Sequence, residues 1–145
     1  MRILVMGLPG SGKSTFARKL VEDIKAVGRS VEWFNADKMR EAFNDWDFSE
    51  EGRIRQAERM ARFAHNAETM NNIVVADFVC PTNKLRSIFN PDIIVWMDTI
   101  AAGRYADTNK IFEAPTHYDY HITELDAMPW TKVIADQFKN YYNEA

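Results

Sequence analysis

Short apolar runs of strand length alternate along the chain with longer segments of helical periodicity. Apolar runs that end in polar or turn residues predict β-strands, and they span residues 3–6, 31–35, 73–79, 93–97 and, more weakly, 118–123. Apolar residues that recur every three or four positions predict α-helices, and they span residues 13–27, 38–43, 49 to about 70, and 130–142. The pattern therefore predicts strands and helices in alternation.

Residues with clear capping or stop preferences mark the ends of the first three helices. Gly28 follows the first helix as a stop. Asp37 is well placed to cap the second helix, residues 38–43. Ser49 precedes the third helix, and Glu50 and Glu51 suit the positive end of its dipole.

Alternating strands and helices favour the α/β fold class, with a mostly parallel sheet of five strands and helices on both faces. We expect a single three-layer domain over residues 1–145. Right-handed crossovers place the carboxyl ends of parallel strands at one edge of the sheet, where ligands bind. Segments 7–13, 35–40, 77–81 and 98–104 all follow strands, so all four should face one cleft.

The composition excludes several function classes. The chain has 145 residues, of which 46% are hydrophobic and 27% charged, as in ordinary globular proteins. The formal net charge of −3 argues against a cationic surface for long nucleic acid. Cys80 is the one cysteine, which excludes an internal disulfide framework. No apolar run approaches the roughly 20 residues that span a bilayer, so we expect a cytoplasmic protein with no membrane partner. A homodimer is left open.

The segment after the first strand matches a phosphate-binding loop in full. Residues 7–14 fit G-x-x-x-x-G-K-S/T, and a threonine follows. In such a loop the backbone N–H groups and the next helix N-terminus surround nucleotide phosphates. We expect ATP and Mg²⁺ as cofactors, with Lys13 on the β- and γ-phosphates and Ser14 on the metal. The predicted nucleotide-binding residues are Gly7, Leu8, Pro9, Gly10, Ser11, Gly12, Lys13, Ser14 and Thr15. The motif indicates a P-loop NTPase domain.

A phosphate loop alone does not define a function. A GTP switch normally carries Asn-Lys-x-Asp, but here Asn109 and Lys110 precede Phe112 where the aspartate belongs. The chain also lacks a long acidic Walker B run and room for a motor or transporter ATPase. A kinase of a small acceptor is therefore favoured, and a non-catalytic ATP sensor is the alternative.

Polar and aromatic residues after the second strand suggest an acceptor site. Asp37 could accept the proton of an attacking hydroxyl, with helix capping as its alternative role. Arg40 could hold an anionic acceptor. Arg53 and Gln56 share one face near the start of the third helix, with Phe48 nearby. An aromatic ring beside a guanidinium suits a planar base with an anionic group.

Further charged residues have two interpretations each. Asp77 ends the third strand and could hold a Mg²⁺-bound water; the alternative is a capping or solvated loop acid. Arg104 could be a lid residue that stacks on adenine or neutralises the transferring phosphate; the alternative is an exposed helix arginine. The spacing of Arg55, Arg59 and Arg62 is typical of a solvated helix face.

The order of these motifs resembles that of the adenylylsulfate kinase family. Phosphate loop, Asp-x-x-Arg, Asp-Phe-Ser-x-Glu-x-Arg and a strand ending in x-x-Cys-Pro follow one another up to about residue 81. That family transfers the γ-phosphate of ATP to the 3′-hydroxyl of adenosine 5′-phosphosulfate. The resemblance implies that Asp37 is the acid–base or Mg²⁺-linked carboxylate. It also implies that a small-molecule nucleotide substrate contacts Arg40, Phe48, Arg53 and Gln56.

The chain departs from the family pattern in and around the acceptor motif. The family has Asp-Gly-Asp where residues 35–37 read Asn-Ala-Asp. It has Glu-Asp-Arg-x-Glu-Asn where residues 51–56 read Glu-Gly-Arg-Ile-Arg-Gln. Its Ile-Ser-Pro becomes Val-Cys-Pro at residues 79–81, and its long lid is reduced to residues 103–110. The Asn-x-Asp-x-x-Arg run also resembles polynucleotide 5′-kinases, which are the alternative acceptor class.

Overall fold

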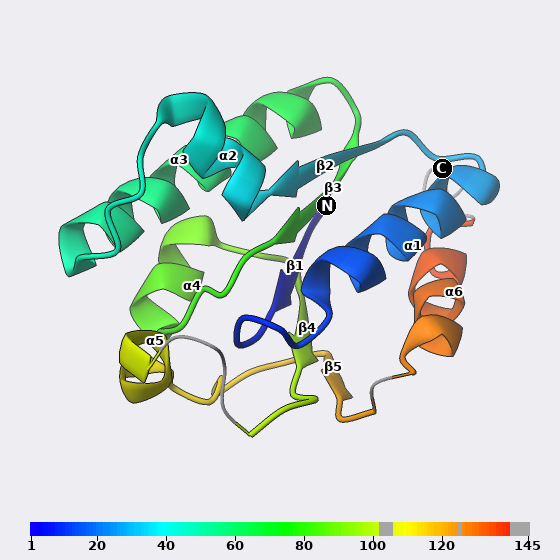
Figure 1. Ribbon diagram of the computed structural model, residues 1–145. Coiled ribbons are helices and arrows are strands. Elements are labelled where there is room, and N and C mark those ends of the chain that lie inside the picture. Colours follow the sequence, from blue (N-terminus) through cyan, green and yellow to red (C-terminus); the bar gives the residue numbers. More distant parts are fainter. Residues whose placement is uncertain (102–105, 125, 140–145) are drawn as a thin grey trace.

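The computed structural model describes residues 1–101, 106–124 and 126–139 (Figure 1). The strands are β1 (Arg2–Met6), β2 (Val31–Asn35), β3 (Ile73–Asp77), β4 (Ile93–Met97) and β5 (Tyr120–Ile122). The helices are α1 (Lys13–Ala26), α2 (Ala36–Phe43), α3 (Glu50–Thr69), α4 (Asn83–Phe89), α5 (Ala106–Ile111) and α6 (Met128–Asp136). Strands and helices therefore alternate, as the sequence pattern predicts.

The described strands form one parallel sheet in the order β2-β3-β1-β4-β5. The central strand β1 pairs with β3 on one side and with β4 on the other. Both β1 and β3 are almost wholly buried, as expected for strands that are covered on both faces. The predicted α/β fold, with a five-stranded parallel sheet between helices, is confirmed.

Alternate residues of β1 face two separate hydrophobic cores. Ile3 and Val5 belong to the core beneath α1 and α6, whereas Leu4 and Met6 belong to the core beneath α3 and α4. Figure 1 shows these two helix pairs on opposite sides of the sheet. Among the described residues, none of the helices is both long enough and apolar enough to cross a membrane.

Local backbone geometry changes several predicted boundaries. The strand expected over residues 73–79 ends at Asp77, which is level with the last residue of the neighbouring strand β2, Asn35. Cys80, with φ 45°, and Pro81 follow in the loop beyond it. The fifth strand is shorter than expected, and the last helix ends at Asp136. Residues 140–142 of the predicted closing helix lie outside the described residues. The short helices α4 and α5 were not predicted.

The caps of α2 and α3 were predicted with different success. Ser49 caps α3 as expected, because its Oγ accepts the backbone N–H of Gly52 at 3.2 Å. Asp37 does not cap α2, because that helix begins two residues earlier than expected. Asn35 caps it instead, and its Oδ1 accepts the backbone N–H of Lys38 at 3.0 Å. Asp37 lies exposed in the first turn, so capping no longer explains it.

Arg86 in α4 joins the chain after β3 to the segment before β5. Its side chain is 4% exposed. Nε donates to the Cys80 carbonyl at 3.0 Å, Nη2 to the Glu113 carbonyl at 2.6 Å, and Nη1 to Asn83 Oδ1 at 2.9 Å. Burial lowers the pKa of Arg86. A buried cation needs its donors paired, and the planar fork of arginine meets that need here.

Arg86→Lys should lower the free energy of unfolding by about 2 kcal/mol, because a single ammonium leaves at least one buried carbonyl unpaired. Lys84→Arg, at an exposed position of the same helix, is the matched control and should change it by less than about 0.5 kcal/mol. Urea unfolding followed by circular dichroism measures both variants. Equal stability of Arg86→Lys and the wild type would contradict the role given to Arg86.

Candidate active site

The phosphate loop between β1 and α1 needs glycine at three positions. Gly10 and Gly12 have φ of 89° and 94°, in the region that favours glycine. Gly7 has φ 151°, and a Cβ there would overlap the backbone carbonyl of Met97 in β4. The glycines of the motif are therefore required by backbone conformation and by the closeness of β4.

Contacts from two sides hold the phosphate loop. The backbone N–H of Ser11 donates to the Leu8 carbonyl at 3.1 Å, and Lys13 Nζ donates to the same carbonyl at 3.0 Å. Thr99, just after β4, donates from Oγ1 to the Ser11 carbonyl at 2.8 Å. The described part of segment 98–104 thus supports the loop and does not line the cleft, contrary to the prediction.

The carboxylate of Asp77, at the end of β3, lies beside Ser14 of the phosphate-loop motif and is 2% exposed. Its Oδ1 accepts Trp33 Nε1–H at 2.6 Å. Its Oδ2 accepts the Ser14 hydroxyl at 2.9 Å and the Asn35 Nδ2–H at 2.9 Å. The parallel register sets Asp77 level with Asn35 of β2 and Val5 of β1. Residues of α1, β2 and β3 therefore meet at one carboxylate.

Burial raises the pKa of Asp77, and the hydrogen bonds from Trp33, Ser14 and Asn35 offset part of that rise. The alternative of a solvated loop acid is wrong for this buried group. The Ser14 hydroxyl and the Asp77 carboxylate both line the cavity described below. They are hard oxygen donors of the kind that Mg²⁺ takes. The donor set therefore fits Mg²⁺, and Ser14 and Asp77 are the residues that would hold it.

Phe48 forms an aromatic surface on the opposite side of the site, with its side chain 52% exposed. Arg40 Cζ lies 4.2 Å from the ring centroid, and Arg53 Cζ lies 5.5 Å from it. Arg53 Nε also donates to the Phe48 carbonyl at 2.8 Å, and its Nη2 donates to Thr108 Oγ1 at 3.5 Å. An exposed ring beside cations suits a planar ligand that carries an anionic group.

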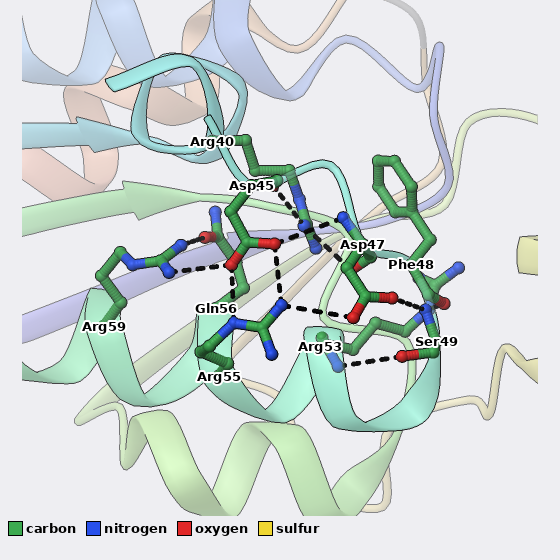
Figure 2. Close-up of polar contacts among 10 residues, drawn as sticks. Arg40, Asp45, Asp47, Phe48, Ser49, Arg53, Arg55, Gln56 and Arg59 are labelled. Carbon is green, nitrogen blue, oxygen red and sulfur yellow. Dashed lines mark hydrogen bonds and ion pairs between the residues drawn. The ribbon is translucent and has the colours of Figure 1, made fainter. Parts of the chain in front are cut away.

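Arg40 and Gln56 line the cavity but also make contacts within the protein (Figure 2). Arg40 is buried, and its Nη1 donates to the backbone carbonyls of Asp45 and Asp47 at 2.9 and 3.1 Å. Burial lowers the pKa of Arg40. Gln56 is buried as well, and its Nε2 donates to the Ala36 carbonyl at 3.0 Å. Contact between these two side chains and an acceptor stays a prediction.

Of the three α3 arginines whose spacing predicts a solvated face, Arg55 and Arg62 are exposed and Arg59 is not. Arg59 is buried and donates to Gln56 Oε1 and to Asp45 Oδ2, each at 2.8 Å. Arg55 contacts the same carboxylate, with Nε 2.7 Å from Oδ2. Arg62 is exposed, as expected. The prediction is wrong for Arg59 because the loop before α3 places Asp45 against the helix.

One cavity of about 730 Å³ extends from the phosphate loop to Phe48, within the size range of small-molecule sites. The predicted site residues that line it are Pro9, Gly10, Gly12, Lys13, Ser14, Thr15, Asp37, Arg40, Phe48, Arg53, Gln56 and Asp77. Gly7, Leu8 and Ser11 shape the loop without lining the cavity. Arg104 lies outside the described residues, so its role stays a prediction.

Other residues of the site carried weak sequence signals or none. Asn35 stands where the related family has an acid, and its preference for N-cap positions was the available clue. Trp33 gave no sign that its indole would reach a carboxylate. Thr108 comes from α5, which was not predicted. Cys80 lines the cavity but is buried, and burial raises its pKa, which favours packing over a nucleophilic role.

The model of the adenylylsulphate kinase family matches residues 1–96, from the start of the chain into β4. The chain belongs to the adenylylsulphate kinase family. The resemblance drawn from the order of motifs is thereby confirmed, and so is the assignment to the P-loop kinases. The region after β4, which contains α5, β5 and α6, lies beyond the matched residues.

Curated relatives of this adenylylsulphate kinase family member include an adenylyl-sulfate kinase and a cytidine diphosphoramidate kinase. The adenylyl-sulfate kinase of Bacillus licheniformis is 32% identical over 87 residues, which are 59% of this chain and 44% of that protein. The cytidine diphosphoramidate kinase of Campylobacter jejuni is 28% identical over 83 residues, which are 57% of this chain and 49% of that protein. The chain spans about half the length of these curated relatives.

A solved structure extends the likeness of the fold over nearly the whole chain. The APS kinase CysC of Mycobacterium tuberculosis, solved in complex with AMPPNP and APS, superposes with a TM-score of 0.79. The match covers 95% of this chain and 96% of that chain, at 18% sequence identity. This likeness shows a shared fold that includes the region after β4.

Asp77→Asn tests the buried charge through the pH dependence of stability. Because the native pKa of Asp77 is raised, its protonation favours the folded state. Its contribution to the free energy of unfolding should rise as pH falls from 7, until the unfolded carboxyl also protonates near pH ~4. The variant lacks this titration. The free energy of unfolding of the wild type minus that of the variant should therefore increase as pH falls.

Urea unfolding at several pH values without Mg²⁺ measures that difference. A constant difference, or one that shifts in favour of the variant as pH falls, would contradict the raised pKa.

Proposed function

We propose that the chain transfers the γ-phosphoryl group of ATP to a hydroxyl of a small nucleotide-like acceptor, and that this acceptor is adenosine 5′-phosphosulfate. One observation carries the proposal: a single cavity is lined both by the phosphate loop and by Phe48 with its neighbouring guanidiniums. Membership of the adenylylsulphate kinase family supports the same reaction class and the use of ATP.

On the donor side, the phosphate loop holds ATP. Lys13 exchanges its contact with the Leu8 carbonyl for the β- and γ-phosphates, where a charge-assisted hydrogen bond is stronger. Ser14 and Asp77 hold Mg²⁺, which when bound neutralises charge that develops on the phosphates. The hydrogen bonds of Trp33 and Asn35 to Asp77 keep its carboxylate oriented toward that position.

On the acceptor side, Phe48 stacks the base and Arg53 binds an anionic group beside it. Asp37 lies exposed at the cavity, in the first turn of α2. Its carboxylate accepts the hydroxyl proton as the new O–P bond forms and the bond between the γ-phosphorus and the bridging oxygen breaks. ADP then leaves with the electron pair of that bond.

Two observations bear on the alternative acceptors. A polynucleotide 5′-hydroxyl is less favoured, because Arg55 and Arg59 pair with Asp45 and so add little to a basic track for phosphates. A cytidine nucleotide is the second candidate, because the relative from Campylobacter jejuni matches nearly the same share of the chain as the adenylyl-sulfate kinases do.

A transfer assay with γ-labelled ATP separates these functions. Adenosine 5′-phosphosulfate, cytidine diphosphoramidate and a DNA 5′-hydroxyl are offered in turn, and we expect label on the first. Label on another acceptor would replace the proposed substrate. ATP binding without transfer to any acceptor would favour the sensor. Lys13→Ala is the control for the donor site and should lower turnover by roughly a hundredfold or more.

Asp37→Asn should lower kcat by roughly a hundredfold, because the amide cannot accept the hydroxyl proton. The melting temperature should stay within about 2 °C, since Asn35 and not Asp37 caps α2. Glu41→Gln, an exposed acid of the same helix, is the matched control and should leave kcat unchanged. Steady-state kinetics and thermal unfolding measure both. A near-normal kcat in Asp37→Asn would reject Asp37 as the proton acceptor.

A further inference from the structure

The loop that joins α2 to α3, residues 44–49 and here called the acceptor loop, carries two aromatic side chains to the cavity. Trp46 is 49% exposed and Phe48 is 52% exposed, and both line the cavity. The loop is neither helix nor strand. Half-exposed rings gain little from core packing, so other contacts must hold them in place.

An ion-pair cluster, here called the Asp45 clasp and made of Asp45, Arg55 and Arg59, fixes the loop to α3 (Figure 2). Arg55 donates from Nε to Asp45 Oδ2 at 2.7 Å and from Nη2 to Oδ1 at 2.8 Å. Arg59 donates from Nη2 to Oδ2 at 2.8 Å. The Asp45 side chain is 11% exposed, so these charge-assisted bonds are partly shielded from water.

Arg40 fixes the same loop through its backbone. Its Nη1 donates to the carbonyls of Asp45 and Asp47, and its guanidinium lies over the Phe48 ring. Figure 2 shows Arg40 above the loop and Arg55 below it. The loop therefore has contacts with two arginines, of which Arg40 also contacts the Phe48 ring directly.

Gly52 allows the loop to lie close to the start of α3. A Cβ at this position would overlap the backbone carbonyl and the carboxyl carbon of Asp47. The Asp47 carboxylate in turn accepts from Ser49 N–H at 2.9 Å and from Arg55 Nη2 at 3.2 Å. Gly52 and Arg55 stand where the family pattern has Asp and Glu. An aspartate at 52 would collide with Asp47, and a glutamate at 55 would repel both carboxylates.

We propose that Gly52 and Arg55 act as one device: Gly52 makes room for the acceptor loop and Arg55 closes the Asp45 clasp, so that Trp46 and Phe48 stand as a fixed wall of the acceptor site. Arg55 and Asp45 are thus positioning residues that act through the two rings. The link to acceptor binding rests on the proposed function, whereas the position of the rings does not.

Arg55→Met tests the clasp without a buried change, because Arg55 is half exposed. The accessibility of Trp46 to acrylamide is measured by fluorescence quenching. The fluorescence of the other tryptophans is recorded in the Trp46→Phe variant of each protein and subtracted. The Trp46 quenching constant should rise at least about twofold as the loop loosens. Arg62→Met, two turns further along α3 at an exposed position, is the matched control and should leave it unchanged.

Kinetics provide the second readout once an acceptor is identified. Arg55→Met should raise the acceptor KM about threefold to tenfold, which is the size expected for a partly exposed ion-pair network, with the ATP KM within about twofold. Arg55→Lys should give an intermediate KM, because lysine keeps the charge without the two-donor fork. A rise in both KM values would mean that the loss is general and would overturn the positioning role.

Gly52→Ala gives an independent test of the pairing of the two residues. If they act as one device, Gly52→Ala should expose Trp46 about as much as Arg55→Met does, and the double variant should expose it little further. Unchanged quenching in Arg55→Met, or fully additive effects in the double variant, would overturn the proposal. Because quenching needs no substrate, failure of the proposed function would leave this test intact.

Discussion

The carboxylate of Asp77 lies in the interior at the end of β3, and three donors from α1 and β2 converge on it. Burial of a charge disfavours the folded state unless hydrogen bonds satisfy it. Trp33 and Asn35 therefore hold β2 and the start of α2 in a defined place relative to the phosphate loop. The same carboxylate lines the cavity beside the phosphate loop, and its oxygens are of the kind that Mg²⁺ takes.

The side of the cavity that carries Phe48, which we propose binds the acceptor, is held by contacts of side chains with a loop. Its aromatic wall lies on a loop that is tied to α3 by arginines, one of which is half exposed. Backbone hydrogen bonds and glycine conformations, in contrast, fix the phosphate loop. Loops accept substitutions that a buried sheet edge does not. A kinase whose ATP site is rigid and whose acceptor site lies on a loop can therefore change its acceptor and keep its reaction.

Sequence reasoning was most reliable where the determinants are local. The apolar runs gave the strands of the sheet, and Ser49 gave the start of α3. It failed at α2, where Asn35 and Asp37 are both good caps and the end of β2 decided between them. It also missed α4, because the seven residues from Asn83 to Phe89 show too little periodicity to stand out.

The sequence by itself determined the phosphate loop, because the loop needs its glycines, lysine and serine at fixed spacing for steric and electrostatic reasons that lie within eight residues. The order of motifs up to about residue 81 indicated the family. Only the tertiary structure decided which charges are paired. Asp77 of β3 accepts a hydrogen bond from Trp33 of the neighbouring strand β2, and Asp45 pairs with Arg59, about two turns into α3. Such pairs depend on strand register and on how a loop lies against a helix. Periodicity reports which face of an element is apolar, but it does not report which partner that packing brings within hydrogen-bond distance.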